Sequence, residues 1–201
     1  MVFYFYLSVL ILILGAQIFL RSYVSRYRQS NDRRIDDKVN KFINKAKLIF
    51  WLVFVFQIFW LVYGVRKQYL VWQADETAKY LLPPYQSVSY FLFYSYGRII
   101  SSLIVSLGAA LLFLFLTQYL NRRFQERFFY PEEPYLGAIA VLIISHPLWL
   151  FYLILVILIT LLGTIVKRVT SYKLQVTSSR FSPYYFWIPL AIFIIIINKL
   201  A

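Results

Sequence analysis

The sequence predicts an all-α, polytopic membrane protein: a helical bundle of about five to six membrane segments, including a proline-turned hairpin or re-entrant element, plus an amphipathic interfacial helix. Three observations support this class. Hydrophobic residues make up 61% of the 201-residue chain and charged residues only 14%, whereas an ordinary soluble domain is roughly 25% charged. The apolar residues come in blocks close to the roughly 20 residues that a bilayer core requires. The basic residues, which give a formal charge of +13, gather between these blocks.

Several classes of site are excluded by composition. The chain has no cysteine, so a disulfide, a thiolate metal site and a redox-active cysteine pair are excluded. Its single histidine, His146, excludes bis-histidine haem ligation and argues against a zinc site. No glycine-rich phosphate loop, histidine pair for zinc or Gly-x-Ser-x-Gly elbow is present in the sequence. We therefore predict no cofactor and no bound metal.

The first apolar block, Val2–Leu20, is predicted to be an uncleaved first span (residues 1–20). It lacks the charged start and the small-residue cleavage site of a signal peptide. The following segment, residues 21–47, holds nine Lys and Arg against three Asp. Nucleic-acid binding is one explanation of such a run, but short cytoplasmic loops between spans collect Lys and Arg in the same way. Because spans flank both sides, we predict a cytoplasmic loop, an N-terminus outside the cell membrane and no nucleic-acid partner.

The end of this loop, Asp32–Lys47, is predicted to form an amphipathic helix on the inner leaflet that leads into the second span. Asn31 or Asp32 can cap it, and apolar and basic residues then fall on different faces at helical spacing. Each basic side chain near an anionic surface contributes about 1 kcal/mol, so anionic inner-leaflet lipids are the predicted partners. Docking to another protein is the alternative. The predicted apolar face comprises Ile35, Val39, Phe42, Ile43 and Ala46, and the predicted membrane-surface residues are Arg33, Arg34, Lys38, Lys41, Lys45 and Lys47.

Three further spans are predicted at residues 48–65, 98–120 and 184–201, and an outer interfacial segment, residues 66–97, connects the first two of them. The outer segment is rich in Tyr and Trp, a composition typical of the membrane interface. Pro83–Pro84 interrupts any helix within it. The segment is therefore expected to lie along the membrane surface.

Three polar residues are candidate sites inside the membrane. Gln57 lies within the second span and must find a partner in the protein, because lipid offers no hydrogen bond. Arg98 stands at the outer end of the third span, either as an interfacial anchor or as an intramembrane charge with a functional partner. His146 follows in the longest apolar block, as a polar turn residue or, alternatively, as a functional group.

The longest apolar block, residues 135–166, is predicted to be a hairpin. The preceding loop, residues 121–134, follows a span that runs inwards, and the next loop, residues 167–183, has four basic and no acidic residues, so both are expected inside. One straight helix of 32 residues would be about 48 Å long, far beyond a hydrocarbon core of about 30 Å. Pro147 disfavours helical geometry at His146 and so places the turn there. Whether the part of the hairpin before Pro147 crosses the membrane or re-enters on the same side stays open.

Glu132 and Glu133, which stand between Pro131 and Pro134, are the candidate catalytic residues. As a cap and first-turn pair, carboxylates stabilise a helix N-terminus by about 0.3–1 kcal/mol each. Alternatively, two carboxylates at a membrane boundary can share a proton and activate water. The helical rise over the intervening residues separates them from His146 by roughly 16 Å, so these residues are not expected to form one site.

The C-terminal half carries Glu133-Pro134-Tyr135-Leu136, then Ser145-His146, Gly163 and Phe181-Ser182-Pro183-Tyr184. In type and spacing these residues resemble the motifs of type IV prepilin leader peptidases: a Gly-x-Gly-Asp-x-Lys-Leu stretch, a Gly-Trp pair, a glycine-bearing span and a Phe-Gly-Pro-Tyr/Phe segment. For the intact family, the resemblance implies a polytopic membrane fold and aspartic protease activity at the cytoplasmic face. It assigns the motif aspartate to Glu133 and the motif lysine to Tyr135. The family's second catalytic aspartate has no counterpart here.

The function predicted first is that of a scaffold or subunit: a multi-pass membrane protein without an intact active site, acting through helix packing and its basic inner-face loop. Its partners would be the lipid bilayer and other membrane proteins. The alternative is a membrane-embedded hydrolase or transferase at the cytoplasmic interface, distantly like prepilin peptidase, with Glu132 and Glu133 at its centre. A transporter is disfavoured, because neither internal repeats nor pairs of interrupted helices are visible in the sequence.

We predict that single cysteines introduced at Gln125 and at Ser178 of this cysteine-free chain will both react with a membrane-impermeant thiol reagent only from the cytoplasmic side. The reason is that the hairpin returns the chain to the face from which it started. Labelling of intact cells and of inverted vesicles measures this, and a cysteine within residues 66–97 should show the opposite pattern. Reaction of the two loop cysteines from opposite sides would contradict the hairpin.

Overall fold

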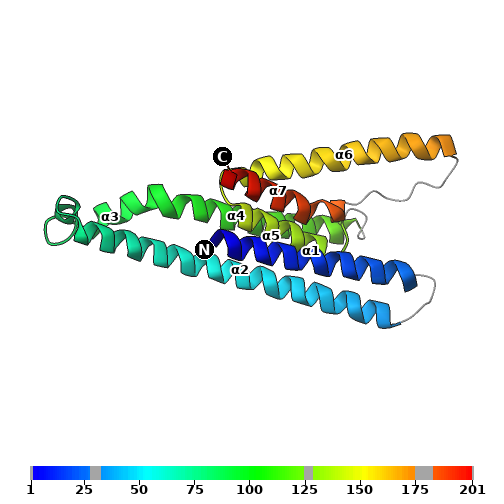
Figure 1. Cartoon of the computed structure of the whole chain (residues 1–201), viewed down its shortest axis with the longest axis horizontal. Helices are drawn as coiled ribbons and strands as arrows, with labels where there is room; N and C mark the ends of the chain where they lie inside the picture. The colour runs from blue at the N-terminus through cyan, green and yellow to red at the C-terminus, as the bar shows by residue number, and fades with distance from the viewer. Residues whose placement is uncertain (1, 28–32, 125–128, 175–182, 201) are drawn as a thin grey trace.

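The structure, a computed structural model, describes residues 2–27, 33–124, 129–174 and 183–200, and these residues are folded into helices and connecting turns without a strand (Figure 1). The predicted all-α class is confirmed. The α-helices are α1 (Val2–Tyr27), α2 (Arg33–Ala74), α3 (Val88–Ser95), α4 (Ser101–Arg123), α5 (Glu133–Ile144), α6 (Leu148–Leu174) and α7 (Trp187–Leu200). Two 3-10 turns, η1 (Ala78–Leu81) and η3 (Pro183–Tyr185), and a π-helical turn, η2 (Tyr96–Ile100), complete the described structure.

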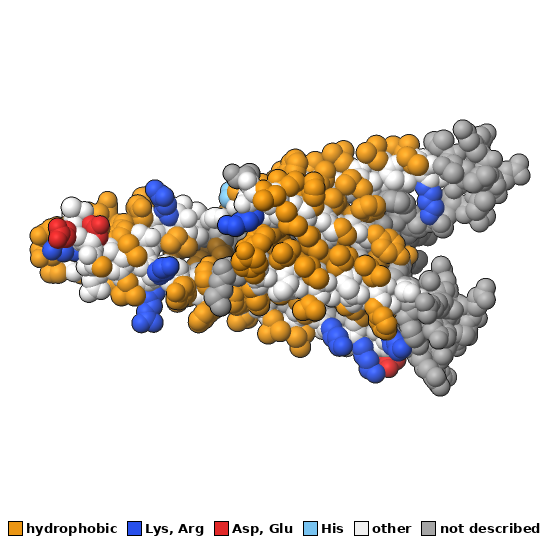
Figure 2. Space-filling view, in the orientation of Figure 1, with side chains coloured by type: hydrophobic (Ala, Val, Ile, Leu, Met, Phe, Trp, Pro, Cys, Tyr) orange, Lys and Arg blue, Asp and Glu red, His pale blue; other side chains and the backbone are white. Residues whose placement is uncertain are grey.

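Within the part of the chain that the structure describes, five helical stretches are long and apolar enough to cross a membrane, so the chain is a multi-pass membrane protein. Large hydrophobic side chains are exposed on these helices and cover most of the bundle surface visible in Figure 2. A bilayer provides the apolar surroundings that such a surface needs, whereas water does not. The stretches are Phe3–Leu20, Asp37–Ala74, Val88–Arg123, Leu148–Lys167 and Pro183–Leu200.

The helix ends that flank the predicted cytoplasmic loops lie at one end of the bundle, here called the basic end (Figure 1). They are the end of α1, the start of α2, the ends of α4 and α6 and the start of α7. The predicted turn after α5 is confirmed, since α5 ends at Ile144 and α6 begins at Leu148. The labelling sites Gln125 and Ser178 lie outside the described residues.

Two predicted boundaries differ from the structure. The helix predicted at Asp32–Lys47 continues into the second span, because α2 is one helix of 42 residues, about 63 Å long, with no proline to interrupt it. The apolar side of its first part turns toward the bundle, where Ala46 is buried and Phe42 packs on the core. The helical stretch of the third span begins at Val88, soon after Pro83–Pro84, and not at Arg98.

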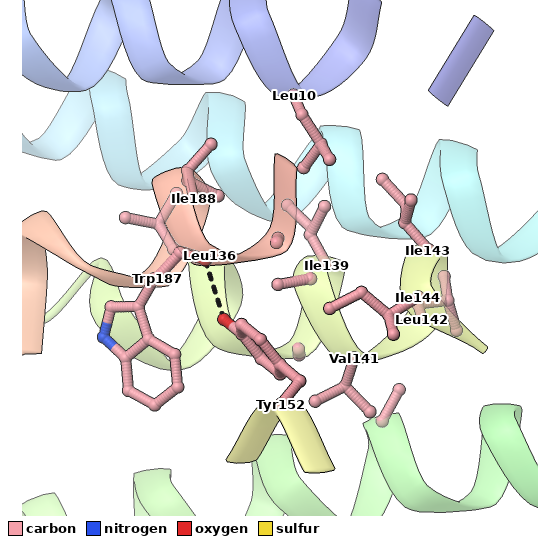
Figure 3. Packing of buried hydrophobic residues seen from close by; sticks show 14 of the residues in the cluster. Leu10, Leu136, Ile139, Val141, Leu142, Ile143, Ile144, Tyr152, Trp187 and Ile188 are labelled. Atoms are coloured by element: carbon pink, nitrogen blue, oxygen red, sulfur yellow. Dashed lines mark hydrogen bonds between the residues drawn. The ribbon is translucent and has the colours of Figure 1, made fainter. Parts of the chain in front are cut away.

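The helix α5 occupies the centre of the bundle. It has 12 residues, of which all but Tyr135 are buried, and it is too short to cross the roughly 30 Å hydrocarbon core. Figure 3 shows its apolar side chains packed against Leu10 of α1, Tyr152 of α6 and Ile188 of α7. The hydroxyl of Tyr152 donates a hydrogen bond to the carbonyl of Trp187 over 2.8 Å. Helix α5 therefore links the surrounding helices into one core.

Gly137 lets α5 approach its neighbours closely. A Cβ atom at this position would lie 2.5 Å from Cε1 of Phe113 and 3.2 Å from Cε3 of Trp187. These two rings already pack edge to face, with centroids 5.4 Å apart. They leave no room for a methyl group without a shift.

We predict that Gly137→Ala lowers the free energy of unfolding by about 1–3 kcal/mol, because the added methyl overpacks the contact with Phe113 and Trp187. Thermal unfolding of the detergent-solubilised protein measures the change. Gly15→Ala is the matched control, since a Cβ there meets nothing within 4 Å and alanine favours helix by roughly 1 kcal/mol. Equal unfolding temperatures for the two variants would show that the Gly137 contact is not tight.

Candidate functional site

Glu132 and Glu133 lie at the N-terminus of α5 inside the protein. Only 4% of Glu132 and 0% of Glu133 is exposed. The amide of Glu133 donates to the carbonyl of Tyr130 over 3.0 Å, and the carbonyl of Glu132 accepts the amide of Leu136 over 3.2 Å. Glu132 occupies the N-cap position, but its side chain makes no capping hydrogen bond. The two carboxylates thus stand at the positive end of the α5 dipole, buried at the basic end of the bundle.

Buried amide side chains fasten the segments around this acidic pair. Gln17 of α1 donates through Nε2 to the carbonyl of Tyr184, and the Tyr184 hydroxyl donates to the Gln17 carbonyl over 3.4 Å. The Tyr184 ring packs edge to face with Tyr130, 5.8 Å between centroids. Asn121 of α4 donates to the carbonyl of Phe129 over 2.9 Å and accepts its amide over 3.0 Å. This network holds α1, α4, the entrance to α5 and η3 in place around the acidic residues.

Gln17 and Asn121 were not among the predicted site residues. Gln17 is 1% exposed and Asn121 is 7% exposed. For Gln17, an isolated amide inside an apolar block was the available signal, the same one that singled out Gln57. Asn121 lies beside Arg122 at the end of its apolar block and gave no such signal.

The opposite end of α5 is closed by side chains of α2 and α4. Gln57, which is 1% exposed, donates through Nε2 to the carbonyl of Leu142 over 2.7 Å. Leu142 carries one of the last four carbonyls of α5, which lack a partner within the helix. The amide of His146 donates to the Ser106 hydroxyl over 2.7 Å, and the Ser102 hydroxyl donates to the His146 carbonyl over 3.4 Å. Gln57 therefore finds a partner in the backbone of α5.

The structure does not gather the remaining predicted residues into one site. His146 is exposed and follows the C-terminus of α5, whose 12 residues separate it from the glutamates by about 18 Å of helix. Arg98 is exposed within η2, with its guanidinium carbon 5.8 Å from the centroid of the Tyr94 ring. Among the residues that the structure describes, no three His, Cys, Asp or Glu side chains come together as metal ligands.

The predicted membrane-surface residues that are described lie exposed along the first part of α2 (Figure 2). Lys41 pairs with Asp37 over 2.8 Å, one helical turn away. Lys38, Lys45 and Lys47 are also exposed. The side chains of Arg33 and Arg34 are not among those that the structure describes. Binding of these residues to an anionic surface stays a prediction.

Residues 66–97 form an arm that extends past the ends of α1, α6 and α7 (Figure 1). The arm comprises the end of α2, then η1, α3 and the start of η2. It has its own small core of Trp72, Leu82 and Phe91, separate from the main one. The ring of Phe91 packs edge to face on Trp72 and on Tyr69, at 5.4 Å in both cases. The arm is thus a folded extension of the bundle.

Asp75 shapes the turn after α2. Its Oδ1 accepts the amide of Ala78 over 2.8 Å, the hydroxyl of Thr77 over 2.7 Å and the amide of Thr77 over 2.9 Å. These hydrogen bonds, that of Ala78 first, hold the pKa of the Asp75 carboxyl below its ordinary value, although the group is fully exposed. The carboxylate therefore supports this turn at neutral pH and loses that role only as the pH falls through the lowered pKa.

Comparison of the chain with protein-family models, with curated proteins and with solved structures finds no match. The resemblance of the C-terminal half to prepilin peptidases therefore stays an expectation from the sequence motifs. The candidate sites stand on their own geometry: a buried acidic pair at the basic end, a closed turn at the other end of α5, and an arm with its own small core.

Proposed function

We propose that the protein is a scaffold or subunit of a membrane assembly, acting through its helix surfaces, its basic loop and, above all, its arm. The exposed aromatic side chains of the arm carry the proposal. Tyr85 is 63% exposed and Phe93 79% exposed. Large apolar patches outside the core mark interaction sites, and aromatic residues are enriched in the buried centres of protein interfaces. Further exposed aromatic residues of the arm are Tyr80, Tyr90, Tyr94 and Tyr96.

The length of α2 supports a position of the arm at the membrane surface. Its charge-free part, Leu48–Val65, has 18 residues and is about 27 Å long, close to the thickness of a hydrocarbon core. The helix then continues from Arg66 to Ala74, roughly another 13 Å. The aromatic side chains of the arm are thus presented where membrane proteins meet each other and the lipid headgroups.

We predict that the double change Tyr85→Ala and Phe93→Ala weakens co-purification with partner proteins in mild detergent. An interface aromatic that acts as a hot spot contributes about 2 kcal/mol, or roughly thirtyfold in affinity. Quantitative mass spectrometry of the purified complexes measures the loss. Phe115→Ala is the control, because Phe115 of α4 is 65% exposed but lies outside the arm. A wild-type protein that purifies alone would contradict the scaffold proposal.

A second candidate function, a membrane-embedded hydrolase or transferase, is favoured by the burial of the acidic pair. Ionisable side chains are costly in an apolar interior and are kept there mostly for a function. A substrate would reach Glu132 and Glu133 at the basic end of the bundle. The resemblance to prepilin peptidases assigns the acidic motif position to Glu133.

We predict different outcomes of Glu133→Gln for the two candidates, because this change keeps the shape of the side chain and removes its charge. If the protein is a scaffold, the variant supports the cellular phenotype as the wild type does. If it is an enzyme, the variant fails to support the phenotype although its abundance in the cell is unchanged. Charge reversal of Lys38, Lys41 and Lys45 is the complementary change, which impairs a scaffold that uses its basic loop. Immunoblotting of the membrane fraction separates loss of activity from loss of protein.

A further inference from the structure

An apolar groove runs between α1 and α2. Its volume is about 650 Å³, within the range of sites that bind small molecules. Leu136 and Ile139 of α5 form its floor. Of the described residues that line it, Lys45 alone is charged and all others are apolar.

The groove is left open because the residues on its walls are small where the two helices face each other near the basic end. Ala16 of α1 and Ala46 of α2 both line this part. A large side chain at position 16 would close the gap, but alanine reaches little beyond the backbone. The space between α1 and α2 is therefore a consequence of the sequence, and it opens toward the surroundings of the bundle.

We propose that this groove binds one acyl chain of an anionic phospholipid, with the phosphate of the lipid beside Lys45. The walls on α2 run from Phe42 to Phe59, about 26 Å of helix. One leaflet of the hydrocarbon core is about 15 Å thick. An acyl chain that enters at the basic end therefore fits along the groove with room to spare.

The distribution of charge indicates which lipid binds. Lys45 lies near the basic end of an otherwise apolar groove. An amphiphile with its acyl chain in the groove would have its headgroup at this end. Lys41 is paired with Asp37, whereas Lys45 makes no ion pair with any residue that the structure describes. The flexible stem of lysine can follow the apolar wall while the ammonium group meets a phosphate. An anionic headgroup carries a net negative charge that attracts the ammonium group, whereas a zwitterionic headgroup carries no net charge.

A second copy of the chain is a poorer occupant of the same groove. The membrane-spanning part of α1 contains no acidic residue, and neither do α4 and α6. Contact with α1, α4 or α6 of a second copy would therefore leave Lys45 without a counter-charge, and Asp37 of α2 is already paired with Lys41 of its own chain. Charge complementarity thus favours a lipid phosphate.

The proposal is tested by native mass spectrometry of the full chain in detergent with equal amounts of phosphatidylglycerol and phosphatidylcholine that carry the same acyl chains. We expect one tightly held lipid for each protein, with phosphatidylglycerol preferred. Ala16→Phe should abolish this bound lipid, because the ring fills the groove. Lys45→Gln should reduce the preference for phosphatidylglycerol about fivefold, the effect of one lysine beside an anionic surface.

Two matched controls separate the groove from general lipid contact. Ile11→Phe adds a ring on the exposed face of α1, outside the groove, and should leave lipid binding unchanged. Lys67→Gln removes an exposed lysine from the arm and should leave the preference unchanged. Retention of the tightly held lipid in Ala16→Phe would overturn the proposal. So would a dimer of the lipid-free wild type that Ala16→Phe converts to monomer.

Discussion

The structure depends on satisfying the backbone of α5. This helix is too short to cross a membrane, and it ends among apolar side chains. Its first amides and last carbonyls have no partners within the helix, and lipid cannot provide them. The loop before α5 supplies the Tyr130 carbonyl at its N-terminal end. Side chains of α2 and α4 meet the chain at the C-terminal end, and this requirement fixes how those two helices lie against α5.

The few polar residues inside the bundle answer this requirement. Gln57 of α2 and Ser106 of α4 close the C-terminal end of α5 through the Leu142 carbonyl and the His146 amide. Near its N-terminal end, Gln17 holds η3, which precedes α7, and Asn121 holds the loop that enters α5. These residues are scattered in the sequence because they belong to different helices. Their shared role is to support an interrupted helix, which explains why so few of them are needed.

The surfaces that could engage other molecules are separated along the molecule. The start of α5, which carries the acidic pair, and the first part of α2, which carries Lys45, lie toward the basic end, whereas the arm lies at the opposite end (Figure 1). A change in one surface can therefore leave the others intact, as additivity holds for distant sites without shared partners. The role of the arm can thus be tested independently of the acidic pair and of the lipid groove.

The sequence by itself determined the all-α class, the turn at Ser145–Pro147 and the interruption at Pro83–Pro84, because hydropathy and proline act locally. It also singled out Gln57 and the two glutamates, since polar residues in or beside apolar blocks are conspicuous. Only the tertiary structure decided that both glutamates are buried, that Gln57 bonds to a carbonyl of α5 and that Gln17 belongs to the same framework. These outcomes depend on which helices lie next to one another, and contacts between residues such as Gln17 and Tyr184 leave no mark in the local pattern of either segment.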